Sequence, residues 1–239
     1  MLDVHPPHAP AHTWRDFFIH IATIVVGLLI AIGLEQTVEG IHRHHQRHQL
    51  EEDLRAEAES RIPLIDHDLA SFGPMADWYG EVLKSARSAP VAGGFVTFTL
   101  PAMAPPSAPI RPPDSVWNAA VASGLVVILP HQQIEVWSRV NYFASLDAKY
   151  HEEIISAGQS VDAVSSRLGV RLDPGASLHL TPADRDELMR SVAVLYEKSR
   201  TFNSNLAGWK GASDAAAHGA HTDEEMMPYI HKAAEGVSR

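Results

Sequence analysis

The segment FFIHIATIVVGLLIAIGLEQ, from Phe17 to Gln36, decides how this chain of 239 residues is built. Its first 18 residues carry no formal charge, and as a helix with a rise of ~1.5 Å per residue they would reach about 27 Å. The hydrocarbon core of a bilayer is ~30 Å thick. Trp14 precedes the run and Glu35 ends it, as is typical of helix ends at membrane interfaces. The sequence therefore predicts a transmembrane helix.

Two other interpretations of this segment stay open at this point. A cleaved signal peptide would place the small residues Ala31 and Gly33 just before a cut at Leu34, but Arg15 is the only Lys or Arg that precedes the run. A buried helix of a soluble core would normally show a polar face, which this segment lacks. Both interpretations fit the sequence less well than a span.

Small residues recur along one row of the predicted span. Thr23, Gly27 and Ala31 are four residues apart, and Glu35 continues the row. Small side chains at this spacing let two membrane helices approach closely, so the row predicts helix association with a second copy or with another membrane protein.

The composition limits the partners and the chemistry of the chain. The formal net charge of -10 argues against nucleic acid as a partner, because phosphate binding relies on clustered Lys and Arg. The chain has no cysteine, which excludes disulfides, thiolate metal sites and cysteine nucleophiles. It has 15 histidines against 19 Lys and Arg, so its charge changes strongly between pH 5 and 7.

The pattern after the span predicts helices with one long loop. Apolar residues at helical spacing extend the first helix through residue 72, where Pro63 should kink it and Gly73-Pro74 should end it before another helix begins at Met75. Residues 89–113 are rich in Pro, Ala and Gly and are expected to form a loop, in which FVTFTL alternates and favours one short strand.

Helices are also predicted in the second half of the chain. A short helix follows the loop, with Asp114 or Ser115 as its N-cap and Gly124 at its end, and the apolar run LVVIL is expected in the core. A long amphipathic helix should run from about residue 131 to 157. The next helix has Thr181 as its cap and Asp184 in a capping-box position. Its expected apolar face consists of Leu188, Val192, Leu195, Phe202 and Leu206.

These elements predict an all-α protein in which the transmembrane helix continues into an antiparallel helical bundle. The expected organisation is an N-terminal tail at residues 1–16, a transmembrane helix at 17–38, and a bundle domain at 39–239 that contains the Pro-rich loop.

One cluster of histidines is a candidate metal site. On a helix, His44 and His48 are one turn apart and His45 lies near His48, so these imidazoles share a face and could bind a divalent transition metal with Glu51 or Glu52. The other interpretation is a collar that titrates at the membrane surface. No HExxH motif supports catalysis by a metal, and HEEII at residue 151 lacks the second histidine.

A second candidate site follows the Pro-rich loop. Asp114, Ser115, Trp117 and Asn118 could line a ligand pocket in the bundle, although capping a helix and burying a Trp would explain the same residues. Ser115 has no nucleophile-elbow context, and AGGF and GWKG lack the spacing of a phosphate-binding loop.

Two stretches of the chain resemble known sequences. HTWRDFFIHIATIVVGLLIAIGLEQTVE and PPDSVWNAAVASGLVVILPHQQIEVWSRV are similar to a group of uncharacterised bacterial proteins with one N-terminal span and a helical domain. More distantly, the chain resembles a larger family whose Ile/Leu-rich anchor ends in an ALQINNW-like tail before a coiled-coil-like helix. The matching positions are residues 27–39 and Trp117, Ser123 and Gly124, and the resemblances cover about half the chain. They imply a single-pass protein of the bacterial inner membrane with a periplasmic domain and no established activity.

The orientation in the membrane is not fixed by charge. Arg43 and Arg47 follow the span and Arg15 precedes it, so a literal positive-inside count favours a cytoplasmic domain by a small margin. The Lys-rich N-terminal flank of the resembling proteins is also absent.

The function that the sequence predicts is that of a membrane-anchored binding or interaction module, a sensor or a scaffold, without a recognisable catalytic site or a cofactor. The alternatives are a metal-binding protein or metal-dependent enzyme that uses the histidine cluster, and a secreted domain whose signal peptide is cleaved.

Overall fold

The structure is a computed structural model, and it describes residues 14–102 and 112–237. Its elements, in chain order, are α1 (Trp14–Ser88), β1 (Val91–Ala92), β2 (Phe95–Thr99), α2 (Ser115–Ser123), the 3-10 helix η1 (Leu125–Ile128), α3 (His131–Leu168), β3 (Ser177–Leu180), α4 (Pro182–Ala217) and α5 (Asp223–Val237). The prediction of an all-α fold is confirmed, because the strands add only a small sheet. The chain divides into two compact units, Met1–Leu50 and Glu51–Arg239, and α1 contributes residues to both.

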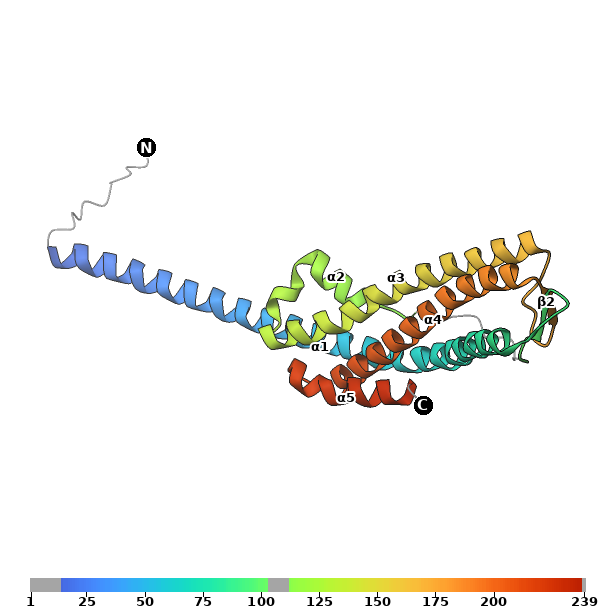
Figure 1. The fold of residues 1–239 in the computed structure, drawn as a ribbon. Helices are drawn as coiled ribbons and strands as arrows, with labels where there is room; N and C mark the ends of the chain where they lie inside the picture. Colours follow the sequence, from blue (N-terminus) through green and yellow to red (C-terminus); the bar gives the residue numbers. More distant parts are fainter. Residues whose placement is uncertain (1–13, 103–111, 238–239) are drawn as a thin grey trace, which may run out of the picture. The chain divides into compact units, whose positions relative to one another are not determined.

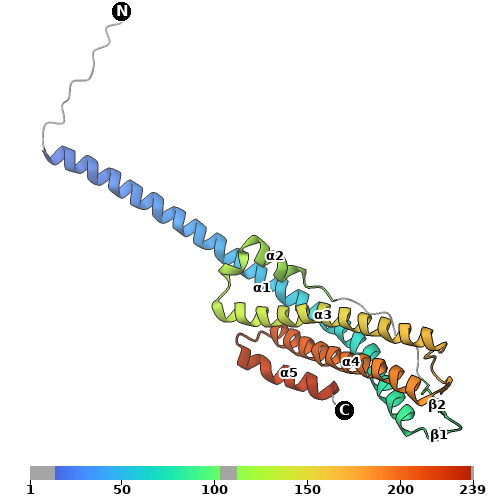
Figure 2. The same ribbon diagram turned by 45° about the horizontal axis from the view of Figure 1, so that its top comes forward.

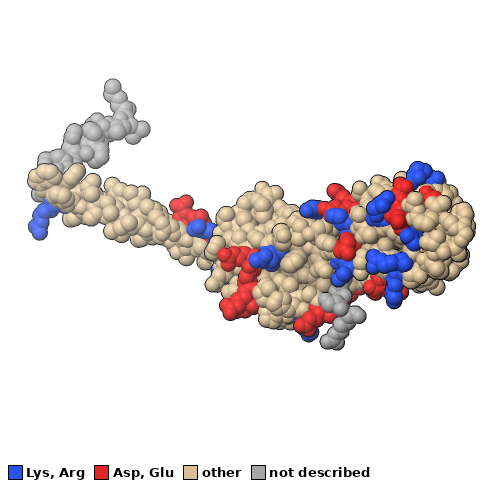
Figure 3. Space-filling view, viewed as in Figure 1, with Lys and Arg blue, Asp and Glu red and all other residues tan. Residues whose placement is uncertain are grey.

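The first unit contains the apolar segment of α1. In the described part of the chain, α1 is the one helix that is long and apolar enough to cross a membrane, and none of its most apolar stretch is buried in the protein. Large apolar side chains such as Phe18 and Leu29 are more than half exposed. In Figure 3 no charged side chain is visible along this stretch. The interpretation as a buried core helix is therefore wrong.

The part of α1 in the second unit forms one wall of a helical bundle. Leu54, Ala58, Ile65 and Phe72 are buried, as the helical spacing predicts. The predicted break at Gly73-Pro74 is wrong, because α1 continues to Ser88 with both prolines inside the helix. Proline removes one backbone hydrogen bond, but the helix on either side of Pro74 is held by its buried face.

Helices α3, α4 and α5 complete the bundle. Figures 1 and 2 show α3 and α4 side by side in opposite directions, with α5 packed along α4. Helix α3 runs to Leu168, well beyond the predicted end near residue 157, and it stops at Gly169, whose φ of 68° lies in the left-handed region that glycine favours. Val136 and Val140 are buried, whereas Phe143, Tyr150 and Ile154 are half-buried.

Helix α4 begins and packs as the sequence predicts. The backbone N–H of Asp184 donates to Thr181 Oγ1 over 3.2 Å, and the Thr181 hydroxyl donates to Asp184 Oδ2 over 2.7 Å. All five predicted apolar positions of α4, from Leu188 to Leu206, are at most 3% exposed. Helix α5 starts after Thr222, whose Oγ1 accepts from the backbone N–H of Glu225 over 3.3 Å.

A three-stranded antiparallel sheet with the order β1-β2-β3 joins the two strands that follow α1 to the strand that precedes α4. The predicted strand in FVTFTL is confirmed as β2, with Val96 and Phe98 buried. The prediction of a loop throughout 89–113 is wrong in its first part, because β1 and β2 form a hairpin around Gly93 and Gly94. These glycines have φ values of 60° and 85°, which a two-residue hairpin turn requires. Residues 103–111 of the predicted loop lie outside the described residues.

The apolar run LVVIL is not part of the core. Residues 125–128 form η1, in which none is buried, and Val127 is 77% exposed. Only Leu129 at the end of the run is buried. Helix α2 ends at Gly124, as predicted, and its left-handed φ of 75° turns the chain into η1 before a core element can form.

Candidate functional site

The start of α2 is capped by a residue that the sequence did not indicate. Asp114 occupies the N-cap position, but its side chain makes no capping hydrogen bond. Instead Glu57 Oε2, on α1, accepts from the backbone N–H groups of Ser115 and Val116 over 3.0 and 2.9 Å, and from the Ser115 hydroxyl over 3.0 Å. A carboxylate at a helix N-terminus satisfies free N–H groups and favours the helix dipole. Glu57 therefore ties α2 to α1.

Arg61 completes a buried polar network with Glu57. Its Nη2 donates to Glu57 Oε1 over 2.9 Å, and Nε and Nη2 donate to the carbonyl oxygen of Pro113 over 2.9 and 2.7 Å. The guanidinium also lies 5.1 Å from the ring centroid of Trp209 on α4. Burial lowers the pKa of Arg61 below its usual value, and the charges of Glu57 and Asp114 oppose that shift. The pair links three segments of the bundle.

The pocket predicted at Asp114, Ser115, Trp117 and Asn118 is mostly filled. A cavity of about 10 Å³ touches Asp114 and the buried Trp117, together with Trp137 of α3. Such a space holds about one water molecule. Ser115 and Asn118 do not line it, and the Asn118 side chain donates to the Asp114 carbonyl over 2.9 Å. All four predicted residues therefore lie in the N-cap and first turns of α2.

A larger cavity of about 640 Å³ lies between α1, α4 and α5. The α1 wall includes Asp66, Ala70 and Pro74, and α5 contributes Tyr229 and Lys232. Its volume is in the range of small-molecule sites. This cavity is the candidate functional site.

Asn203 of α4 lines this cavity and also carries a buried hydrogen-bond acceptor that is not used. The residue is 3% exposed, and its Nδ2 donates to the Phe72 carbonyl oxygen over 3.1 Å. That bond fixes the orientation of the amide, because a carbonyl oxygen accepts only from the N–H side. Asn203 Oδ1 is buried and has no hydrogen-bond partner in the described part of the chain. A buried polar atom of this kind costs free energy unless something pairs with it.

The charged residues around the cavity balance each other. Lys210 Nζ lies 2.6 Å from Asp66 Oδ1, and Asp214 and Asp77 add two carboxylates. Arg200 and Lys232 supply two further cations. The walls therefore offer both signs of charge, which suits a polar or zwitterionic molecule better than a simple ion.

Helix α5, which forms one wall of the cavity, packs closely against α4 at Gly211. A Cβ added to Gly211 of α4 would lie 2.6 Å from Ile230 Cα and 2.7 Å from the Tyr229 carbonyl oxygen. Gly211 therefore allows the backbones of α4 and α5 to approach at the edge of the cavity.

The remaining predicted sites lie on α1 in the first unit. His44, His45 and His48 are exposed, and among residues 14–102 and 112–237 no group of three or more His, Asp or Glu is placed to hold a metal ion. Thr23, Gly27, Ala31 and Glu35 are also exposed, with nothing within 4 Å of a Cβ built on Gly27. The Thr23 hydroxyl donates to the Ile19 carbonyl within the same helix over 2.8 Å. A second helix could therefore contact this row mainly by close packing against its small side chains.

Sequence reasoning missed Glu57, Arg61 and Asn203. One signal for the polar interior of α4 was present: Ser199, four residues after Leu195, continues the apolar row and is fully buried. Asn203 follows four residues later. The contacts of Glu57 with residues 58 and 59 positions away have no local signal.

Comparison of the chain with protein-family models, with curated proteins and with solved structures gave no match.

Proposed function

We propose that the protein is a single-pass membrane protein of the bacterial inner membrane whose helical domain is a binding module of the sensor type. Its ligand is a small polar molecule that occupies the cavity between α1, α4 and α5. The observation that carries the proposal is that the cavity wall includes α1, the helix that also contains the apolar span. A ligand that changes the packing of α1 in the bundle thereby acts on the same helix that enters the membrane.

The charges on the cavity wall support a polar ligand. Lys210 Nζ lies 2.6 Å from Asp66 Oδ1, and two further cations and two further carboxylates line the same cavity. The cavity is also too large to be a packing defect of one or two methyl groups. We propose that the domain is periplasmic, in line with the sequence resemblance.

Blocking the cavity tests the binding function. The full chain, purified in detergent, is screened for stabilisation of its thermal midpoint by amino acids, dipeptides and small amides. Ala70→Phe places a ring at the cavity wall, and Ala56→Phe is the matched control, because both alanines are exposed on α1 and only Ala70 lines the cavity. We expect compounds that stabilise the wild type to lose their effect in Ala70→Phe and to keep it in Ala56→Phe. Equal stabilisation of all three proteins would contradict the proposed site.

Two measurements separate the alternatives. If N-terminal sequencing shows that the mature protein starts near Leu34, the apolar segment is a cleaved signal peptide and not an anchor. If the purified protein contains a stoichiometric amount of metal, and the variants His44→Ala and His48→Ala do not, a metal-binding function is favoured.

The topology is tested by labelling, because the native chain has no cysteine. A single Ala163→Cys on the exposed face of α3 should react with an impermeant maleimide once the outer membrane is permeabilised. Reaction only after the inner membrane is opened would place the domain in the cytoplasm.

A further inference from the structure

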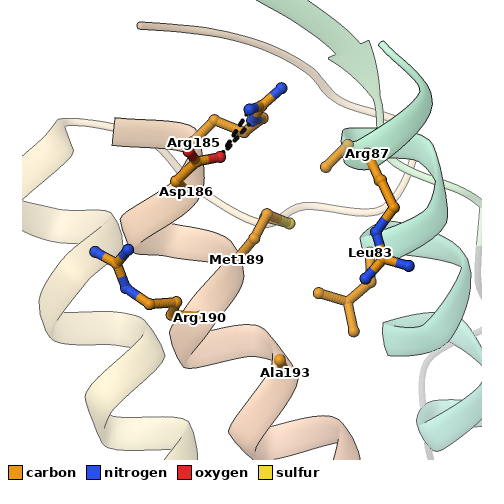
Figure 4. A pocket seen from close by; sticks show the side chains of 8 residues that line it. Leu83, Arg87, Arg185, Asp186, Met189, Arg190 and Ala193 are labelled. Atoms are coloured by element: carbon orange, nitrogen blue, oxygen red, sulfur yellow. Dashed lines mark hydrogen bonds and ion pairs between the residues drawn. The ribbon is translucent and has the colours of Figure 1, made fainter. Parts of the chain in front are cut away.

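Two open surfaces are separate from the cavity on which the proposed function rests. One is a cleft of about 430 Å³ between the end of α1 and the first turns of α4 (Figure 4). Met189 lies between Arg190 on one side and Arg87 on the other, so these two cations do not converge on one ligand. The other surface is a row of exposed side chains on α1 that begins at the end of the apolar span.

Val38 and Ile41 are large apolar side chains outside both the apolar span and the core of the bundle. Each is 66% exposed, and both follow Glu35, which ends the uncharged run. Ile41 lies about 9 Å beyond Glu35 along the helix. Every residue from Glu35 to His45 is exposed, so this stretch of α1 packs against nothing in the described part of the chain. A single helix of this length is marginal in water, because most helical stability comes from packing.

These two residues belong to a row that has the spacing of a coiled coil. Successive members of the row are four, three, four and three residues apart, and all of them are exposed. They are Leu34, Val38, Ile41, His45 and His48. This is the alternation of d and a positions in a heptad, which keeps one face of a helix against a partner helix. Counted backwards, the same alternation reaches Ala31 and Gly27, whose small side chains let two helices approach closely in the membrane.

The charged residues of this stretch lie away from the row. Arg43 Nη2 lies 3.4 Å from Glu39 Oε1 on the same helix, and neither residue is a member of the row. The positions that flank the row between residues 36 and 49 carry no Asp, Glu, Lys or Arg. They are Thr37, His42, His44 and Gln49. Two copies of this face can therefore meet without placing like formal charges opposite each other.

We propose that two copies of this chain pair in parallel along the row from Leu34 to His48. The parallel direction rests on the single-pass anchor of the proposed function, because copies that enter one membrane in the same orientation run side by side. Val38 then packs on Val38 of the second copy, and Ile41 on Ile41. A second copy supplies a matching side chain at every layer, so the partner is this chain itself. His45 occupies an a position, where a polar residue lowers stability but fixes the register.

Disulfide cross-linking of the full chain in cell membranes tests the proposal, because the native chain has no cysteine. The variants are Val38→Cys and Ile41→Cys in the row, with Glu39→Cys and Arg43→Cys outside it as controls, and dithiodipyridine is the oxidant. A disulfide needs Cα atoms no more than ~7 Å apart, which paired helices offer only along the row. We expect the two row variants to form linked dimers at least about tenfold faster than the controls.

Glutamine variants test the pairing without a covalent link. Val38→Gln with Ile41→Gln removes the apolar contacts, and Glu39→Gln with Arg43→Gln is the matched control outside the row. Energy transfer between donor-labelled and acceptor-labelled copies in phosphatidylcholine vesicles measures the dimer. We expect the first pair of substitutions to weaken it at least about tenfold and the second pair to leave it unchanged. The thermal midpoint should not change in either variant, because these side chains are exposed in the chain.

Three results would overturn the proposal. Equally fast cross-linking at all four positions would show that copies collide without a defined face. A linked product of Val38→Cys with a different membrane protein would assign the row to that protein. An unchanged dimer in Val38→Gln with Ile41→Gln would place the contact elsewhere. None of these results bears on ligand binding in the cavity, which Ala70→Phe tests separately.

Discussion

Glu57 and Arg61 are buried charges that depend on each other. They are 9% and 3% exposed. Glu57 also accepts from the backbone and the hydroxyl at the start of α2, and Arg61 donates to the Pro113 carbonyl oxygen and, from Nη1, to Ser213 Oγ over 3.4 Å. Removal of one charge leaves the other desolvated, which is far more costly than loss of an exposed pair. This arrangement fixes the position of α2 on α1.

We expect Glu57→Ala to lower the free energy of unfolding by about 3–5 kcal/mol, because Arg61 becomes an unpaired buried cation and α2 loses its cap. Urea denaturation followed by tryptophan fluorescence measures the change. Glu81→Ala is the control: its pair with Lys84 is mostly exposed, and its loss should cost less than about 1 kcal/mol. A similar cost for both variants would mean that the buried network contributes little.

Removal of the Asn203 amide should cost little stability, in contrast to removal of the Glu57 carboxylate. Asn203→Leu replaces a half-satisfied amide by an apolar group of similar shape, so we expect the free energy of unfolding to fall by no more than about 1 kcal/mol or to rise. Compounds that stabilise the wild type through the cavity should lose their effect in the same variant. A loss of more than about 2 kcal/mol in urea denaturation would instead assign Asn203 to the support of the helix at Phe72.

At the scale of elements, the packing of α5 on α4 depends on one glycine. Gly211→Ala places a methyl group against backbone atoms of α5, which cannot move aside as a flexible side chain could. We expect a loss of about 1–3 kcal/mol in urea denaturation and a weaker ligand response of the cavity. Gly158→Ala on α3 meets nothing within 4 Å and should be neutral or slightly stabilising. Equal effects of the two variants would show that α5 is not held at this point.

Local signals account for the elements that could be predicted from the sequence. The capping pair of Thr181 and Asp184 and the apolar row of α4 depend on residues within a few turns, and both are confirmed. The Gly93-Gly94 turn is also a local signal, but the Pro, Ala and Gly content of residues 89–113 favours a loop and hides the hairpin. Pro74 shows the limit of such signals, since tertiary burial of Phe72 and Ala76 outweighs the cost of a proline inside α1.

The candidate sites were less predictable than the helices. The cavity is lined from α1, α4 and α5, and its lining residues span positions 66 to 236. Asn203 meets Phe72 across 131 positions, so no motif or spacing marks it. The residues of the predicted pocket at α2 lie at a helix start, and the residue that organises this start, Glu57, lies in another helix.

At the scale of the whole molecule, the apolar segment of α1 is the feature that the bundle cannot explain. None of its most apolar stretch is buried in the chain, so its side chains need another apolar environment, which a bilayer provides. Its row of Thr23, Gly27 and Ala31 offers a surface where a second helix can approach closely.

We expect the double substitution Gly27→Leu and Ala31→Leu to weaken self-association of the span in a membrane two-hybrid assay, because larger side chains keep the helix backbones apart. The Thr23 hydroxyl is already bonded to Ile19, so van der Waals packing is the main interaction that the row can supply. Ala22→Leu with Gly33→Leu is the matched control, since it adds the same side chains at small residues outside the row. If the two double variants associate as strongly as the wild type, the segment acts as an anchor alone. In that case the domain, and not the span, would have to supply any contact between copies.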